Sequence, residues 1–189
     1  HPRVRRQRQM CIRDSQSIIE ENNDLLLQLI SDILDLSKIE AGTFDFVEKE
    51  LDVNLLCEDI VRVMKMKIKP GVELIFERHL PECTIISDRN RLNQVISNFV
   101  NNAIKFTSEG SICIGYDQID ESHLRFYVSD TGIGIEKEKQ AEIFERFVKL
   151  NSFVHGTGLG LPISKSIIKQ MGGTIGIDLS LIHISEPTR

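Results

Sequence analysis

Amide, lysine and arginine side chains recur on one face of the segment 89–106. They follow one another at spacings of three and four residues, which place them on the same side of a helix: Arg91, Gln94, Asn98, Asn102 and Lys105. A solvated helix face usually carries acids as well as lysines, and this face has none. Because amide oxygens can ligate Mg²⁺ and lysine can contact phosphate, the face predicts contact with a phosphorylated ligand. An ordinary solvated face is the alternative.

A second stretch, Val128–Ile135, presents an aspartate followed by two glycines. A strand that ends near Asp130 would deliver a carboxylate able to accept hydrogen bonds from a ligand amine. Gly132 and Gly134 would let that ligand approach the backbone closely. Turns also favour Asp and Gly, so the stretch does not decide a function alone.

A third stretch, Gly156–Leu161, reads GTGLGL and lies directly before a helix expected from Pro162. Glycine-rich backbone N–H groups at a helix N-terminus form an anion site that the helix dipole strengthens. Proline fits the first helical position, where its missing N–H costs nothing. The pattern is neither a P-loop nor a dinucleotide-binding fingerprint.

Taken together, these stretches resemble the sequence boxes of sensor histidine kinases. Asn98–Thr107 resembles the N box, Asp130–Gly134 the G1 box, Phe144–Phe147 the F box and Gly156–Gly160 the G2 box, in the family's order. Ile33–Gly42 resembles the end of the family's second dimerisation helix. The resemblance covers about residues 17–180. It implies an ATP-binding catalytic domain of the GHKL type with a Bergerat-type fold, and ATP and Mg²⁺ as cofactors.

The resemblance also implies a role for each matched position. Asn102 would ligate Mg²⁺ with Asn98 nearby, and Lys105 would meet the phosphates; Asn102 and Lys105 would be the catalytic pair. The nucleotide-binding set implied by the boxes is Asn98, Asn102, Lys105, Asp130, Gly132, Gly134, Ile135, Lys149, Thr157, Gly158, Leu159 and Gly160. Asp130 would bind the adenine amine, and Thr157, Gly158 and Gly160 would bind phosphate oxygens through backbone N–H groups. Phe144 and Phe147 are expected to pack the lid onto the domain.

The implied activity is transfer of the ATP γ-phosphate to a histidine and then to an aspartate of a response-regulator receiver domain. The family's His-Glu acceptor motif is missing, so the acceptor is expected outside this chain, and the chain alone should not autophosphorylate. A parent homodimer is expected from the helix pattern of the family. Two alternatives stay open: another GHKL-type ATPase of the chaperone or topoisomerase kind, and a degenerate module that only binds nucleotide or dimerises.

Periodicity predicts an α/β two-layer sandwich with helices on one face of a mixed sheet, preceded by one long helix. The long helix is expected over 17–40, with apolar residues at coiled-coil spacing that need partner helices. Further helices are expected over 55–67 after an Asn54 cap, 89–106 after an Asp88 cap, 136–144 and 161–171. Strands are expected at Thr43–Glu50, Val72–Glu77, Thr84–Ser87, Ile112–Tyr116, Leu124–Ser129 and Thr174–Leu179.

Composition separates the body of the chain from its two ends. Residues 1–15 and 181–189 resemble translated sequencing-adapter sequence, and we expect both to be extraneous or disordered. The remaining segments are the partial dimerisation helix, 16–42, and the catalytic domain, 43–180. Without the two ends, 17 basic and 26 acidic side chains leave a net charge of −9, which argues against nucleic-acid binding.

Scattered cysteines without metal or disulfide spacing predict buried thiols and a cytoplasmic setting. The sequence holds no apolar run of membrane-spanning length, so we expect no membrane contact by this fragment. A parent protein could be anchored in the inner membrane by segments outside the chain.

Overall fold

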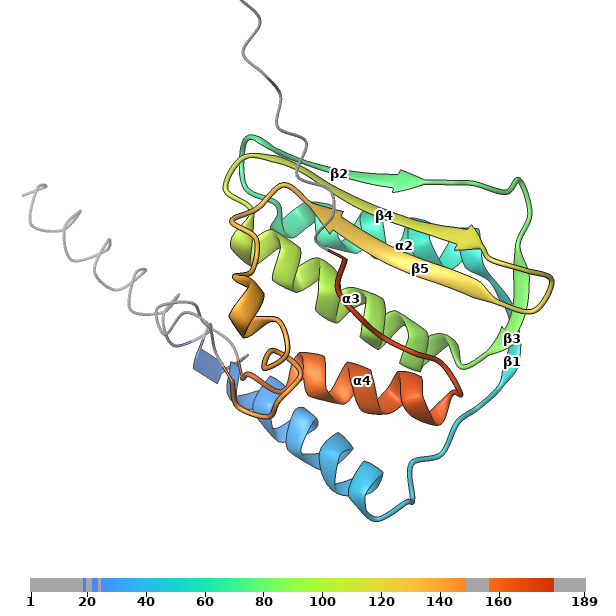
Figure 1. Cartoon of the computed structure of the whole chain (residues 1–189), viewed down its shortest axis with the longest axis horizontal. Coiled ribbons are helices and arrows are strands. Elements are labelled where there is room, and N and C mark those ends of the chain that lie inside the picture. The colour runs from blue at the N-terminus through green and yellow to red at the C-terminus, as the bar shows by residue number, and fades with distance from the viewer. Residues whose placement is uncertain (1–18, 20–21, 24, 149–156, 179–189) are drawn as a thin grey trace, which may run out of the picture.

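The computed structural model describes residues 19, 22, 23, 25–148 and 157–178. A sheet forms one layer, α2 (Val53–Met64) and α3 (Arg89–Phe106) lie against it, and α4 (Gly160–Gln170) packs on the far side of α3 (Figure 1). The expected sandwich, with helices on one face of a mixed sheet and one helix before it, is therefore confirmed. Among the described helices, none is long and apolar enough to cross a membrane.

The sheet has three strands in the order β2–β4–β5: β2 (Val72–Glu77), β4 (Gly110–Gln118) and β5 (Leu124–Asp130). β2 pairs with β4 in parallel and β4 pairs with β5 as an antiparallel hairpin, so the sheet is mixed. A separate antiparallel pair joins β1 (Lys49–Asp52) to β3 (Thr84–Ser87). Alternate residues of β4, including Ile112, Ile114 and Tyr116, are buried because they point into the helical layer.

Helix α3 is the central element of the domain, and its bounds agree with those predicted. The Asp88 carboxylate accepts hydrogen bonds from the backbone N–H groups of Asn90 and Arg91, which caps the first turn. The expected apolar face is buried against the sheet and α4, except that Phe99 is half-buried. One side of α3 thus packs into the main core and another meets α4, which leaves its amide-rich face at the junction of the two helices.

The expected Asn54 cap of α2 is wrong. Asp52 caps the helix instead, because its carboxylate accepts a hydrogen bond from Leu55 N–H at 3.0 Å. Asn54 is buried inside the first turn, where its amide donates to the Leu80 and Pro81 carbonyls and accepts a hydrogen bond from Tyr116 Oη at 2.8 Å. The helix also ends earlier than expected, and residues 65–67 continue as the 3-10 turn η1 (Lys65–Lys67).

Three other expected elements are shorter than predicted or missing. The first strand begins at Lys49 rather than Thr43, because only four residues find a partner on β3. The predicted helix over 136–144 contains only the 3-10 turn η2 (Lys137–Lys139), followed by turns. The predicted last strand is wrong for residues 174–178, which form no ladder in the described part of the chain. Gly173 and Gly176 weaken that segment as a strand, because glycine has no side chain to pack on the sheet.

The helix before the domain covers residues 25–40 and lies beside α4 (Figure 1). Its exposed residues include five of its apolar side chains: Leu26, Leu27, Ile30, Ile33 and Leu34. The two side chains it buries against the domain are carboxylates, Asp32 and Asp35. These exposed residues of the apolar stripe predicted to need partner helices are therefore uncovered on the described molecule, whereas Leu29 and Ile39 pack on the domain beside the two buried acids.

Candidate functional site

The segment after β5 forms a tight turn behind the end of α3. Asp130 is the last residue of β5, and its Oδ1 accepts a hydrogen bond from Gly132 N–H at 2.9 Å. Ile133 N–H donates to the Phe106 carbonyl at 3.3 Å, which ties the turn to the last turn of α3. A Cβ atom on Gly132 would lie 2.6 Å from that carbonyl oxygen, so only glycine fits here.

The turn then leads outward through Gly134, which has a φ of 68° that favours glycine. Ile133 is 76% exposed and Ile135 is half-buried, so apolar surface lies next to the exposed Asp130 carboxylate. A carboxylate at the edge of apolar surface can bind the amine of a flat heterocyclic ring while the ring covers the apolar side chains. The predicted adenine-binding residues are thus adjacent in space as well as in sequence.

The amide-rich face of α3 divides between two neighbours. Asn98 donates hydrogen bonds from its side-chain amide to the Gly160 carbonyl at 3.2 Å and to Ser164 Oγ at 3.1 Å. Asn102 lies one turn further on and is half-buried, and Lys105 is exposed in the last turn. This end of the face adjoins the segment around Gly132 and the start of α4, as the predicted site requires.

The other end of the same face does not belong to a ligand site. Arg91 Nη1 lies 3.3 Å from Asp35 Oδ1, and Gln94 Nε2 donates to Asp35 Oδ2 at 2.8 Å. Arg91 also stacks over the Phe44 ring, with its guanidinium carbon 4.1 Å from the ring centroid. Two of the five polar residues therefore hold the helix 25–40 on the domain. The sequence periodicity cannot separate these two uses of one helix face.

The glycine-rich loop before α4 is bonded at both ends. Gly158 has a φ of 73°, and its carbonyl accepts a hydrogen bond from Phe147 N–H at 3.0 Å. Leu159 is fully buried in the core between α3 and α4, and its N–H donates to Thr157 Oγ1 at 3.2 Å. Among the described residues, no side chain caps the N-terminus of α4, so the N–H groups of its first turn are available to a ligand. A helix start of this kind binds anions.

The expectation for the two phenylalanines before the loop is half right. Phe144 is half-buried and Lys165 Nζ lies 5.5 Å from its ring centroid. Phe147 is 62% exposed and has a φ of 63°, so it does not pack onto the domain. Instead, the backbone N–H of Phe147, whose φ lies in the left-handed region, is hydrogen-bonded to the Gly158 carbonyl. Lys149 and Gly156 lie outside the described residues.

A buried hydroxyl at the end of α3 was missed by the sequence reasoning. Thr107 is fully buried, and its Oγ1 has no hydrogen-bond partner among the described residues. It follows Phe106, whose carbonyl holds the turn around Gly132. Buried polar groups without a partner are rare in folded proteins and accompany sites that receive water or a ligand. Its place at the end of the N-box stretch was the only available signal.

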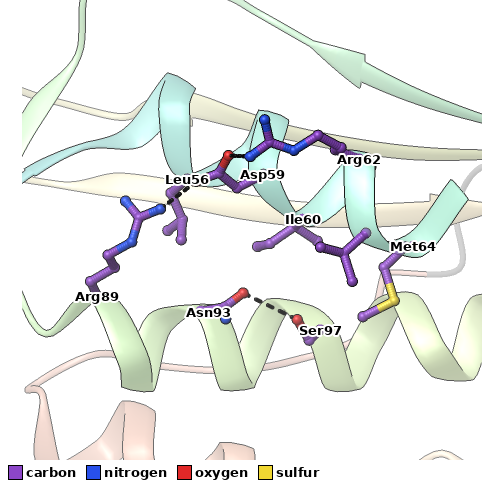
Figure 2. Close-up of a pocket in the computed structure, with 9 residues that line it drawn as sticks. Leu56, Asp59, Ile60, Arg62, Met64, Arg89, Asn93 and Ser97 are labelled. Atoms are coloured by element: carbon purple, nitrogen blue, oxygen red, sulfur yellow. Dashed lines mark hydrogen bonds and ion pairs between the residues drawn. The ribbon is translucent and has the colours of Figure 1, made fainter.

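A separate hollow lies between α2 and α3 and contains none of the predicted site residues (Figure 2). Its volume is about 310 Å³, and its floor includes the core residues Leu56, Ile60 and Met64. At the rim, Asp59 pairs with Arg62 and with Arg89. The two arginines are bound to the same carboxylate across the rim, so they do not converge on the hollow as a ligand site would.

Comparison with known proteins identifies the family. Residues 87–189 match the model of the family described as histidine kinase-, DNA gyrase B-, and HSP90-like ATPase. The chain belongs to this family.

Its catalytic fold is that of the histidine kinase branch, as relatives and solved structures agree. The chain is 37% identical over 178 residues to the sensor histidine kinase GacS of Pseudomonas protegens, covering 87% of this chain and 19% of GacS. It superposes on full-length ShkA, solved in complex with AMPPNP, with a TM-score of 0.77 and 33% identity, covering 87% of this chain and 35% of ShkA.

A further solved structure is histidine kinase ThkA in complex with the response regulator protein TrrA. Its TM-score is 0.64 and its identity 26%, over 82% of this chain and 43% of that one. This ATPase-family chain therefore spans only a part of the longer proteins that it matches.

Proposed function

We propose that the chain binds Mg·ATP as the catalytic part of a sensor histidine kinase, and directs the γ-phosphate to a histidine that lies outside it. The phosphate would then pass to an aspartate of a response-regulator receiver domain. The observation that carries this proposal is the hydrogen bond from the Asn98 amide to the Gly160 carbonyl. It joins the amide-rich face of α3 to the glycine-rich start of α4, so that both can contact one nucleotide.

The adenine would lie at the turn after β5. Its amine would donate to Asp130, whose Oδ1 is already oriented by Gly132 N–H, and its ring would lie beside Gly132, Gly134 and Ile135. The Thr107 hydroxyl, which has no hydrogen-bond partner within the described part of the chain, supports a ligand or a water behind this turn. Discrimination for adenine would follow, because a carboxylate accepts from an amine and repels the carbonyl oxygen that guanine has there.

The phosphates would lie between α3 and α4. N–H groups of Thr157, Gly158, Leu159 and Gly160 would donate to phosphate oxygens, provided that Leu159 N–H leaves Thr157 Oγ1. Lys105 would add a positive charge from the last turn of α3, and Lys149 would approach the terminal phosphate. These groups position the phosphates and stabilise charge during transfer, without covalent participation.

The residues at this junction fit Mg²⁺ only together with a nucleotide. No cluster of three or more His, Cys, Asp or Glu side chains among the described residues could hold a metal. Mg²⁺ typically keeps one or two protein ligands and takes the rest from phosphates and water. The half-buried Asn102 amide would supply such a ligand, with Asn98 beside it. When bound, Mg²⁺ would neutralise phosphate charge.

Dimerisation of the parent protein is proposed through the exposed apolar stripe of the helix 25–40. A stripe at coiled-coil spacing needs partner helices, and the described domain does not cover it. The ThkA–TrrA complex supports a response regulator as the downstream partner. We also propose that the dimerisation part comprises residues 16–42, that the catalytic domain comprises 43–180, and that the site works in the cytoplasm.

Calorimetric titration of the purified chain with ATP, with and without Mg²⁺, tests the nucleotide site. We expect Mg²⁺-dependent binding that Asn102→Ala weakens about tenfold or more, because a metal ligand is lost. Asn93→Ala is the matched control, since Asn93 is an exposed amide on the same helix that bonds only to Ser97 Oγ in the described molecule. Equal weakening by both variants would contradict the assigned site.

Radiolabelled ATP separates the kinase from the other members of the family. We expect no label on the chain alone and no sustained ATP hydrolysis. Label should appear on an added phosphoacceptor domain of a related histidine kinase. Label on any of the five histidines of this chain would refute the external acceptor, and steady hydrolysis would favour an ATPase of the chaperone or topoisomerase kind.

A further inference from the structure

The helix 25–40 meets the domain through a row of carboxylates. Asp32 and Asp35 are 3% and 9% exposed, whereas Leu34 between them is 56% exposed. Buried acids are rare unless paired, and burying them in preference to leucine indicates specific partners. The row consists of Asp32, Asp35 and Glu40, and each of these acids has a partner on the domain. Asp35 binds Arg91 and Gln94. Glu40 binds Arg146, and Asp32 binds Thr157.

The Asp32 contact differs from the other two because it reaches the glycine-rich loop before α4. Thr157 Oγ1 donates to Asp32 Oδ2 at 2.7 Å, and the same oxygen accepts from Leu159 N–H at 3.2 Å. Gln28 Nε2 donates to the other carboxylate oxygen at 2.7 Å. A chain of hydrogen bonds thus runs from the helix, through the Thr157 hydroxyl, to the Leu159 backbone amide of the glycine-rich loop.

This series of hydrogen bonds occupies Leu159 N–H, a donor that a phosphate oxygen would need. While Thr157 accepts from Leu159 N–H, that amide cannot donate to a phosphate oxygen. The Asp32 carboxylate has two hydrogen-bond donors, Gln28 and Thr157, and no cationic partner among the described residues. A buried carboxylate next to an anion site repels an incoming triphosphate, and burial keeps salt from screening the repulsion fully.

We propose that Asp32 is an internal competitor of the nucleotide phosphates. Docking of the helix 25–40 fixes Thr157 and the Leu159 amide in a closed arrangement, and phosphate binding opens it. The inference rests on the proposed nucleotide site and adds a regulatory role for a helix residue. Because linkage is reciprocal, ATP weakens the docking of the helix by the same factor by which docking weakens ATP.

The other two acids of the row provide the docking on which this competition depends. Asp35 binds residues in the first half of α3, and Glu40 binds Arg146 in the segment before the loop, so neither contacts Thr157 to Leu159. Apolar contacts of Leu29 and Ile39 with the cluster around Leu159 and Ile163 support the same arrangement. Any force that rotates or shifts this helix would break the Asp32 contact and raise ATP affinity.

Nucleotide titration of Asp32→Asn tests the proposal, because the amide keeps an acceptor for Thr157 and removes the charge. We expect ATP to bind about threefold to tenfold more tightly than to the unchanged chain. The gain should be smaller for ADP and vanish for adenosine, which has no phosphate. Asp120→Asn is the control: it removes the same charge from the exposed turn between β4 and β5, and should change ATP affinity less than twofold.

Amide hydrogen exchange supplies the second measurement. Saturating ATP should speed exchange in residues 32–40 of the unchanged chain, and have a smaller effect in Asp32→Asn. Circular dichroism melts establish that both variants are folded.

Unchanged or weaker ATP binding by folded Asp32→Asn would overturn the competitor role, and so would an equal gain for adenosine. Absence of ATP binding by the chain and both variants would instead overturn the proposed function, and this inference with it.

Discussion

Replacing Gly132 by alanine should damage both the stability of the domain and its nucleotide site. An added Cβ would lie 2.6 Å from the Phe106 carbonyl oxygen and 2.7 Å from Asp130 Oδ1. The carbonyl belongs to the last turn of α3 and cannot rotate away. The carboxylate can rotate, but it would then lose its hydrogen bond with Gly132 N–H.

The expected cost follows from these contacts. Overpacking of a rigid site costs about 1–3 kcal/mol, and moving the turn weakens two hydrogen bonds worth about 1 kcal/mol each. These bonds are Gly132 N–H to Asp130 and Ile133 N–H to the Phe106 carbonyl. A total of about 2–4 kcal/mol corresponds to a Tm lower by about 4–16 °C in a chain of this size. Because Asp130 loses its orientation, ATP affinity should fall about tenfold or more.

Thermal melts and calorimetry on the same samples measure both effects. Gly176→Ala is the matched control, since nothing lies within 4 Å of the added Cβ and its backbone is not in the left-handed region. Its stability should stay within about 0.5 kcal/mol of the unchanged chain. If Gly132→Ala melts at the same temperature as that control and binds ATP equally well, the close approach between the turn and α3 does not position the site.

Three further predictions concern the framework of the domain. Asn54→Ala should lower the free energy of unfolding by about 1–3 kcal/mol, because Tyr116 Oη and the Leu80 carbonyl lose a buried partner. A denaturant titration measures this, and a change below about 0.5 kcal/mol would contradict the structural role of the Asn54 amide. Burial raises the pKa of the Cys57 thiol to about 12, so iodoacetamide at pH 8 should label it only after unfolding, and rapid labelling of the folded chain would refute its burial. Burial alone would raise the pKa of Asp88, but hydrogen bonds from backbone N–H groups outweigh it and lower the pKa below 3.8. The stabilisation from this ionised cap is therefore present above pH 3.8 and is lost as the pH falls through the lowered value, so the stability difference from Asp88→Asn should shrink below that pH.

The parts of the fold that were predictable depend on local signals. The bounds of α3 follow from a capping aspartate, an apolar face of regular period and no competing signal nearby. For α2, Asp52 and Asn54 are both good caps, and only the tertiary partners of the Asn54 amide decide between them. The missing strand over 174–178 depends on pairing with a distant neighbour, which the local pattern of apolar residues does not encode.

The candidate site likewise has features that were predictable from the sequence and features that were not. Glycines were predictable where the backbone itself needs them, as at Gly132 and Gly158. The division of one polar face of α3 between a ligand and the helix 25–40 was not predictable. Residue spacing places Arg91 and Asn98 on the same face and does not show which of them contacts the helix 25–40. Nor could sequence reasoning find the hydrogen bond between Asp32 and Thr157, which joins residues 125 positions apart.

The placement of the two tyrosines has a spectroscopic consequence. The chain has no tryptophan, so Tyr116 and Tyr127 dominate its ultraviolet emission. The Tyr116 side chain is fully buried on the helix-facing side of the sheet. The Tyr127 side chain lies on the open face over Gly115, where its hydroxyl donates to Glu77 Oε2 at 2.6 Å. A phenol bonded to a carboxylate emits weakly, so the folded chain should be dim and brighten as that bond breaks. Phenylalanine variants at the two positions would separate the signals, so that the two faces of one sheet could be followed independently during unfolding.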